Sequence, residues 1–152
     1  MPDPIRTDVS STLPHTGTAR LLTNVVRSSA GFIEATGQVP ATHPLVGGGC
    51  APCFLGLELG AQAAAALEAI DRAALTGDRS PRIGQLVRVR EAAFLQPTLP
   101  VATPLSVTAT LDGAAPPLAI YRIRVSIGGV EYMHAILSTH VGAGQATVER
   151  SQ

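Results

Sequence analysis

One stretch of the sequence, residues 53–75, can form a long helix, and it restricts the fold more than any other feature. The stretch contains no proline and consists mainly of alanine and leucine, which are strong helix formers. Gly77 follows it, and glycine commonly takes the left-handed conformation that ends a helix. The first half is apolar on all sides apart from Glu58 and Gln62, so we expect it to be buried. The rest of the chain must therefore wrap around one central helix.

Six other stretches have the composition or the alternating pattern of β-strands. Two precede the helix and meet at Ala30-Gly31, as in a hairpin. Four follow it, with turns expected at Asp112-Gly113 and Gly128-Gly129. Residues 42–52 are rich in glycine and proline, and we expect a loop there. The predicted fold class is α+β, with an antiparallel sheet wrapped around one long central helix. The predicted strands are residues 20–29, 31–39, 85–94, 105–112, 121–127 and 130–141.

Composition excludes several classes of protein. A chain of 152 residues with 45% hydrophobic and 14% charged residues is expected to form one domain, residues 1–152, with a substantial core. Eleven acidic and eleven basic residues balance, so there is no overall charge signature of a nucleic-acid partner. The apolar helix carries Glu58, Gln62 and Glu68, which argues against a membrane span. The first residues lack the apolar core of a secretory signal, so we expect a cytoplasmic protein.

Cys50 and Cys53 form a Cys-x-Pro-Cys motif at the start of the helix, which is typical of a redox dithiol. A thioredoxin-like fold needs helices between its later strands, however, and hairpins are expected there instead. One cysteine pair and His43 are also fewer ligands than the four of a usual zinc site. We therefore interpret the two cysteines as packing residues at the junction of loop and helix.

Glu58 is the strongest candidate for a catalytic residue. Burial disfavours the charged form of a carboxylate, so a buried Glu58 is expected to hold a proton at neutral pH, as a general acid must. A structural carboxylate bonded to a loop is the alternative. Gln62 lies one helical turn further on the same face and could orient Glu58. His43 is the best-placed base, although a single loop histidine is more often simply solvated.

The helix start offers a site for a developing negative charge. The glycines of residues 47–49 permit close approach of the backbone to a ligand, with Gly49 nearest to the helix. The first N–H groups of a helix have no partner within it and can hold an oxyanion. Pro52 has no N–H, so Cys53 or Phe54 must supply the donor.

These residues occur with two further motifs, and together they resemble a known family. The motifs are Leu13-Pro14-His15, the loop histidine His43, the helix residues Pro52, Leu55, Leu57, Glu58 and Gln62, and Phe94, Pro97 and Pro100 at a later strand junction. This combination resembles the 3-hydroxyacyl-acyl carrier protein dehydratases of the hotdog fold. The likeness extends from about Leu13 to Val141, and it is greatest to the branch that serves aryl-polyene and related pathways.

The resemblance implies a reaction and a set of roles. His43 would remove a proton from C2 of a 3-hydroxyacyl thioester, and Glu58 would protonate the departing 3-hydroxyl, giving the trans-2-enoyl thioester. The Cys53 N–H would polarise the thioester carbonyl, and Gln62 would hold Glu58 in place. No metal and no redox cofactor are implied. Each site would combine the histidine of one subunit with the acid of the other.

The implied partners are an acyl group on a carrier protein or on coenzyme A, and a second hotdog subunit that is either identical or related. Arg82 and Arg88 lie in a segment, residues 79–90, that contains four arginines and no acid. Carrier proteins are acidic, so this segment is a candidate carrier-binding face, with an ordinary solvated strand edge as the alternative.

Three other functions remain open on the sequence alone. A hotdog thioesterase would use the helix carboxylate to activate water. A non-catalytic acyl-binding or partner subunit is suggested by the shortened histidine loop. A dithiol oxidoreductase would depend on Cys50 and not on Glu58.

Overall fold

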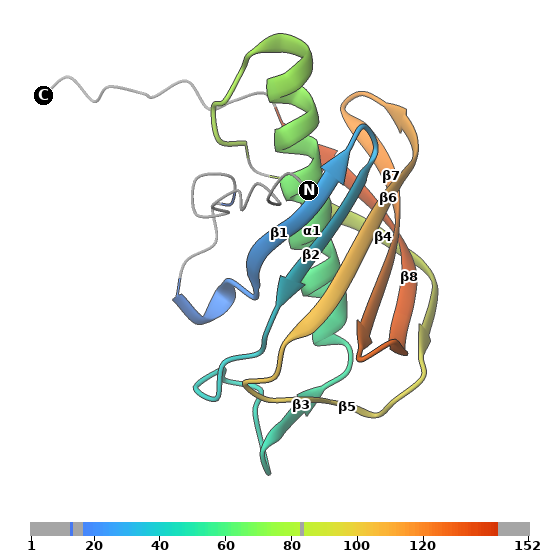
Figure 1. Ribbon diagram of the computed structural model, residues 1–152. Coiled ribbons are helices and arrows are strands. Elements are labelled where there is room, and N and C mark those ends of the chain that lie inside the picture. The colour runs from blue at the N-terminus through green and yellow to red at the C-terminus, as the bar shows by residue number, and fades with distance from the viewer. Residues whose placement is uncertain (1–12, 14–16, 83, 143–152) are drawn as a thin grey trace, which may run out of the picture.

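The computed structural model of this chain shows one long helix lying against the inner face of a strongly curved antiparallel sheet (Figure 1). It describes Leu13 and residues 17–82 and 84–142. Pro14 and His15 of the N-terminal motif lie outside the described residues, as do both ends of the predicted domain. The fold class predicted from the sequence, α+β with a sheet around one central helix, is confirmed.

The main sheet has six strands in the order β1-β2-β6-β7-β8-β4, all neighbours being antiparallel. Two short strands, β3 and β5, pair separately below it (Figure 1). A 3₁₀ turn, Gly17–Ala19, precedes β1. The strands are β1 Leu22–Ser29, β2 Phe32–Gly37, β3 Cys50–Pro52, β4 Gly84–Phe94, β5 Thr98–Pro100, β6 Leu105–Ala115, β7 Leu118–Ile127 and β8 Val130–Val141, and the helix is α1 Leu55–Thr76.

The helix forms where the sequence predicts it. It ends at Gly77, whose φ of 73° lies in the left-handed region and whose N–H donates to the Ala73 carbonyl. It begins two residues later than expected, since Cys53 and Phe54 form a turn before the helix. The hairpins at Ala30-Gly31 and Gly128-Gly129 are also confirmed.

Two sequence predictions about connections are wrong. Asp112-Gly113 is not a turn, because β6 continues to Ala115 with an irregularity in register between Leu111 and Gly113. The chain reverses instead at Pro116-Pro117, since a proline cannot donate to the ladder. The predicted loop 42–52 ends in a strand, because Cys50–Pro52 pairs with β5.

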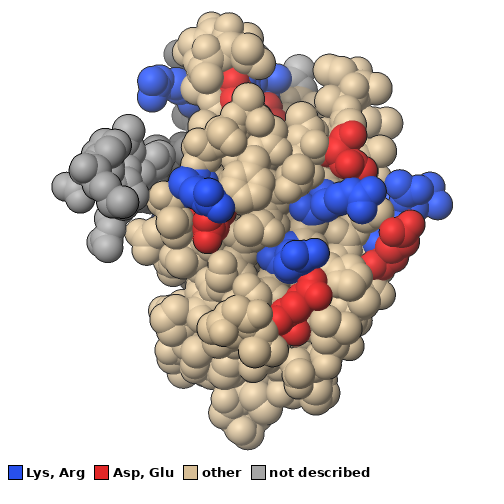
Figure 2. Space-filling view, turned by 45° about the vertical axis from the view of Figure 1, so that its right-hand side comes forward, with Lys and Arg blue, Asp and Glu red and all other residues tan. Residues whose placement is uncertain are grey.

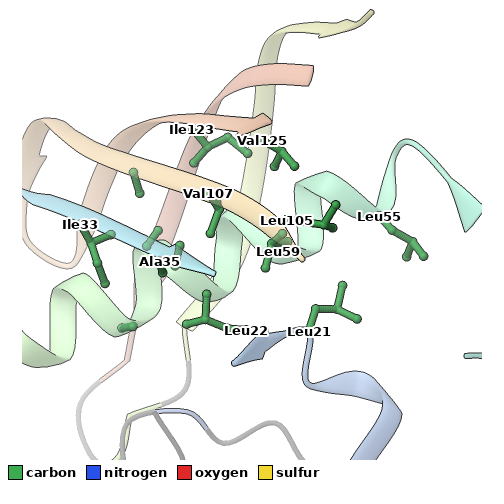
Figure 3. Close-up of a cluster of buried hydrophobic side chains, with 14 of the residues drawn as sticks. Leu21, Leu22, Ile33, Ala35, Leu55, Leu59, Leu105, Val107, Ile123 and Val125 are labelled. Carbon is green, nitrogen blue, oxygen red and sulfur yellow. The ribbon is translucent and has the colours of Figure 1, made fainter. Parts of the chain in front are cut away.

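A continuous core fills the space between α1 and the sheet. Figure 3 shows side chains from β1, β2, β6 and β7 meeting those of the helix, among them Leu59, Val107 and Ile123, which are almost fully buried. The helix approaches the sheet closely at Gly60, where an added Cβ would lie 2.1 Å from the Ile123 Cδ1 atom. A glycine is required there because backbone and side chain already touch.

Within the described part of the chain, nothing covers the inner face of the edge strand β4. Leu86, Val89 and Phe94 pair with inward-facing residues of β8, so they point to the inner face of the sheet. They nevertheless remain 37–45% exposed, because α1 packs mainly against β1, β2, β6 and β7. A long edge strand with an exposed apolar face is a surface to which a strand of another chain can pair.

Candidate functional site

Gln62 is held in place by more hydrogen bonds than the other side chains named for the candidate site. Its side chain is fully buried in α1, and all the hydrogen-bonding capacity of its amide is used. The Oε1 atom accepts from the N–H groups of Leu21 and Leu22 at 2.9 and 3.0 Å. The Nε2 atom donates to the Ala19 carbonyl at 2.7 Å and to Glu58 Oε1 at 3.0 Å. Gln62 therefore ties the helix to the start of β1 and orients one oxygen of Glu58.

Glu58 is exposed in the single chain, and the prediction that its own chain buries it is wrong. The residue lies one turn before Gln62, on the face of α1 that looks toward the uncovered strand β4. Together with Leu86 of that strand it lines a cavity of about 110 Å³ between helix and sheet edge. The sequence pattern could not show this, because it gives the polarity of a helix face but not which strands cover that face.

His43 lies in the loop before β3, is half-buried, and is absent from the lining of the cavity that contains Glu58. Its Nδ1 atom accepts a hydrogen bond from the Leu45 N–H at 3.1 Å. A neutral imidazole that accepts at Nδ1 carries its proton on Nε2. In this conformation the ring's one acceptor is therefore occupied, and His43 can take a proton only after the contact with Leu45 opens.

Of the two backbone donors expected at the start of the helix, one is already used within the described part of the chain. The Cys53 N–H donates to the Pro97 carbonyl at 3.2 Å, so the predicted oxyanion role of Cys53 is wrong in this conformation. Among the hydrogen bonds of the described residues, the N–H groups of Phe54 and Leu55 have no backbone acceptor. Phe54 is the N-cap residue of α1, one helical turn before Glu58, so its backbone donor lies at the N-terminal end of the helix that carries the carboxylate.

Gly49 serves a turn rather than the helix start. Gly47 and Cys50 exchange two backbone hydrogen bonds, with Gly48 and Gly49 between them at φ values of 61° and 77°. A two-residue hairpin loop of this kind requires positive φ, which explains the glycines without a ligand. The three residues of β3 separate Gly49 from the turn that precedes the helix.

The cysteines are packed as the scaffold interpretation expects. The Cys53 thiol is buried and donates to the Tyr132 carbonyl at 3.5 Å. Burial raises the pKa of the Cys53 thiol, whereas a reactive dithiol requires a lowered one. Cys50 Sγ donates to the Gly47 carbonyl at 3.6 Å. Within the described residues no group of three or more histidine, cysteine or acidic side chains could hold a metal ion.

The candidate carrier-binding face is less uniformly positive than the sequence suggests. Arg82 forms an ion pair with Asp78 at 2.8 Å, and Asp78 also contacts Arg72 at 3.2 Å. Asp78 lies one residue before the acid-free segment 79–90, so the composition of that segment does not reveal the acid that neutralises Arg82. Hydrogen bonds from Ser80, and then from Arg82, hold the pKa of Asp78 well below its usual range.

Arg88 differs from Arg82 in its surroundings. It is exposed on β4 and pairs in register with Ser138 on the outer face of the sheet. Positive and negative groups lie beside one another on the face shown in Figure 2, which carries no extended patch of one sign. Of the two arginines predicted to bind a carrier, only Arg88 therefore has a free charge at the surface.

A family model described as ApeP dehydratase, ApeP-like, matches residues 7–148. A search of curated proteins gave no match. In the described part of the chain, no helix is long and apolar enough to cross a membrane.

Solved structures share the fold. The dehydratase heterocomplex ApeI:P from Xenorhabdus doucetiae contains a chain that matches with a TM-score of 0.81 and 20% identity, covering 90% of this chain and 92% of that one. A hypothetical thioesterase from Streptococcus pneumoniae, solved with coenzyme A, matches with a TM-score of 0.58 and 13% identity over 80% and 87% of the two chains. The Escherichia coli PaaI protein matches with a TM-score of 0.58 and 15% identity over 80% of each chain.

Proposed function

The chain belongs to the ApeP-like dehydratase family, and we propose that it removes water from a 3-hydroxyacyl thioester to give the trans-2-enoyl thioester. The proposed setting is the biosynthesis of a polyene, with the acyl group carried by an acyl carrier protein or by coenzyme A. The observation that carries the proposal is the pair of Glu58 and Gln62 beside the cavity at the edge of the sheet. A fully buried amide holds one oxygen of this carboxylate in a fixed orientation beside the cavity.

In the proposed reaction the C2–H bond and the C3–O bond break while a C2=C3 double bond forms. His43 takes the proton from C2, and the electron pair moves toward the thioester carbonyl, where the Phe54 N–H stabilises the developing charge. The pair then forms the double bond as the hydroxyl leaves with a proton from Glu58. A proton passed from His43 to Glu58, directly or through solvent, restores both groups. The contact between His43 and Leu45 must open for this cycle.

The proposed site needs a second subunit. Glu58 is exposed in the single chain, and a general acid works best where water is excluded. The apolar inner face of β4 lies beside the cavity and is exposed among the described residues, so a partner that adds to this edge would also cover Glu58. The partner is a second copy or a related hotdog subunit. The heterocomplex of the Xenorhabdus dehydratase gives weight to a related subunit.

Mixed mutants test whether two subunits share each site. We expect Glu58→Ala and His43→Ala each to lower dehydration about 10²–10⁴-fold, because each removes a proton-transfer partner. When the two inactive proteins exchange subunits as a homodimer, about half of the dimers are mixed and each mixed dimer has one intact site. Activity should return to about a quarter of wild type. With a related partner, the same experiment is done by placing one change in each protein. Folded, exchanging mutants that regain no activity would contradict the shared site.

Hydrolysis is the second candidate reaction, because thioesterases share the fold. Product analysis separates the two: a dehydratase leaves the thioester bond intact, and a thioesterase releases a free thiol. If the chain instead only supports a catalytic partner, Glu58→Ala in this chain will leave the activity of the complex unchanged.

A carrier protein is the proposed delivery route, and Arg88 is the residue through which we expect it to be steered. Arg88→Ala should lower kcat/KM for a carrier-linked substrate more at low salt than at high salt, because long-range attraction is screened by ions. Arg124→Ala, on an exposed arginine already paired with Glu131 at 2.7 Å, is the control. Unchanged kinetics at low salt would exclude this role of Arg88.

A further inference from the structure

The free edge of the sheet carries positive charge as well as apolar side chains. On β4, Arg88 and Arg90 pair in register with Ser138 and Ile136, which lie on either side of the fully buried Leu137 of β8. Because side chains alternate along a strand, both arginines lie on the outer face of the sheet. Both are exposed, and neither forms an ion pair with another described residue. A chain that pairs with β4 therefore meets two uncompensated positive charges.

A second copy of the chain would bring like charges together at this edge. When two identical strands pair antiparallel along the whole of Gly84–Phe94, Val89 lies opposite its own counterpart and Arg88 lies opposite Arg90 of the second copy, twice. A shift of the two-fold axis by one residue, to Arg88 or to Arg90, sets that arginine opposite its own counterpart. Like charges directly opposite each other destabilise a sheet. Each of these three central registers thus carries a repulsion that a different partner can avoid.

The inner face of the same strand favours association without selecting the partner. Leu86, Val89 and Phe94 are 37–45% exposed, and covering them with apolar side chains is favourable. An identical chain and a related one would both cover these residues. The outer face does distinguish the two, because an acidic side chain turns the repulsion into an attraction.

We infer that the partner at this edge is a related hotdog subunit whose own edge strand places an acidic side chain opposite Arg90. The inference rests on the proposed function, and it names the partner of the proposed shared site by its charge. The acid is placed opposite Arg90 because the register neighbour of Arg90, Ile136, is apolar and offers no side-chain acceptor. One acid at this position also leaves the charge of Arg88 free for the proposed steering of a carrier.

An acidic copy of the chain, Arg88→Glu with Arg90→Glu, is a defined probe for such a partner. Wild type and the acidic copy are mixed in equal amounts, left to exchange subunits, and counted by native mass spectrometry at low and at high salt. Random pairing gives about half mixed pairs. The inference predicts about four-fifths mixed pairs at low salt, roughly sixteenfold above random in the exchange equilibrium, and a fall toward one half as salt screens the charges.

Two further variants test which arginine selects the partner. Arg90→Gln, used in place of wild type, should lower the mixed fraction with the acidic copy to about two-thirds or less, because one of the two attractions is lost. Arg79→Glu, on an exposed arginine outside the strands, is the control and should form about half mixed pairs with wild type. Circular dichroism checks that every variant is folded.

The readout is pairing and not turnover, so this inference and the proposed reaction can fail separately. Half mixed pairs at both salt concentrations would overturn the inference, as would an unchanged mixed fraction with Arg90→Gln. A mixture in which no chains pair would overturn it too, because complementary charge would then not be enough to join two chains at this edge. Four-fifths mixed pairs from a protein that dehydrates no substrate would leave the inference standing and reject the reaction.

Discussion

Replacing Gln62 by leucine tests the most heavily bonded side chain of the site. The change replaces the polar side chain by an apolar one of similar size, so it removes hydrogen bonds without leaving a large cavity. The N–H groups of Leu21 and Leu22 lose their acceptor, and the Ala19 carbonyl loses its donor. Each of the two buried N–H groups left without an acceptor costs about 1–3 kcal/mol, whereas Ala19 is exposed and its carbonyl can bond to water instead.

From the two buried N–H groups we expect Gln62→Leu to lower the free energy of unfolding by about 2–4 kcal/mol, after the gain from burying an apolar side chain. Typical domains have about 5–15 kcal/mol, so the variant should remain folded enough to measure. Unfolding in urea, monitored by circular dichroism, gives the free energy of unfolding of each protein. An equal slope of this free energy against urea concentration in wild type and variant would show that both unfold to the same extent.

Gln38→Leu is the matched control. Gln38 is exposed and its side chain makes no hydrogen bond within the described part of the chain, so the change should stay within about 0.5 kcal/mol. A loss below about 1 kcal/mol in Gln62→Leu would refute the reasoning, because it would mean that the buried N–H groups of Leu21 and Leu22 find other acceptors.

Two further predictions concern packing and the cysteines. Gly60→Ala should destabilise the fold by about 1–3 kcal/mol, because the added methyl meets Ile123, whereas Gly84→Ala, with open space around it, should not; thermal unfolding of both variants checks this. Cys53 should react slowly with iodoacetamide at neutral pH and faster as pH rises, since its raised pKa keeps the thiol protonated, and rapid labelling at neutral pH would contradict its buried position. The double change Cys50→Ser with Cys53→Ser should keep most of the dehydratase activity, and a loss of two orders of magnitude or more would show a functional role.

The parts of the fold that sequence predicts well are those decided by neighbouring residues. The helix and its end at Gly77 follow from composition and from the left-handed preference of glycine. The failure at Asp112-Gly113 is of a different kind, because a favourable turn sequence was overridden by pairing between β6 and β7. The proline pair, four residues further on, ends the ladder because it cannot donate to it.

The candidate site depends on contacts that local sequence does not contain. The pairing of Glu58 with Gln62 is visible as a one-turn spacing on a helix. The exposure of Glu58 is not, since it depends on how far the sheet extends over α1. The hydrogen bond from Cys53 to Pro97 and the one from Leu45 to His43 Nδ1 are likewise set by loop geometry.

Mass spectrometry of the products from a panel of 3-hydroxyacyl thioesters tests the central claim most directly. The protein is assayed alone and with a related hotdog subunit, and Glu58→Gln is the paired variant, because glutamine keeps the shape of the side chain but is not a general acid. The account predicts a product that has lost one water and keeps its thioester bond, and loss of this product with Glu58→Gln. Release of a free thiol from the intact 3-hydroxyacyl group, or dehydration that Glu58→Gln leaves unchanged, would contradict it.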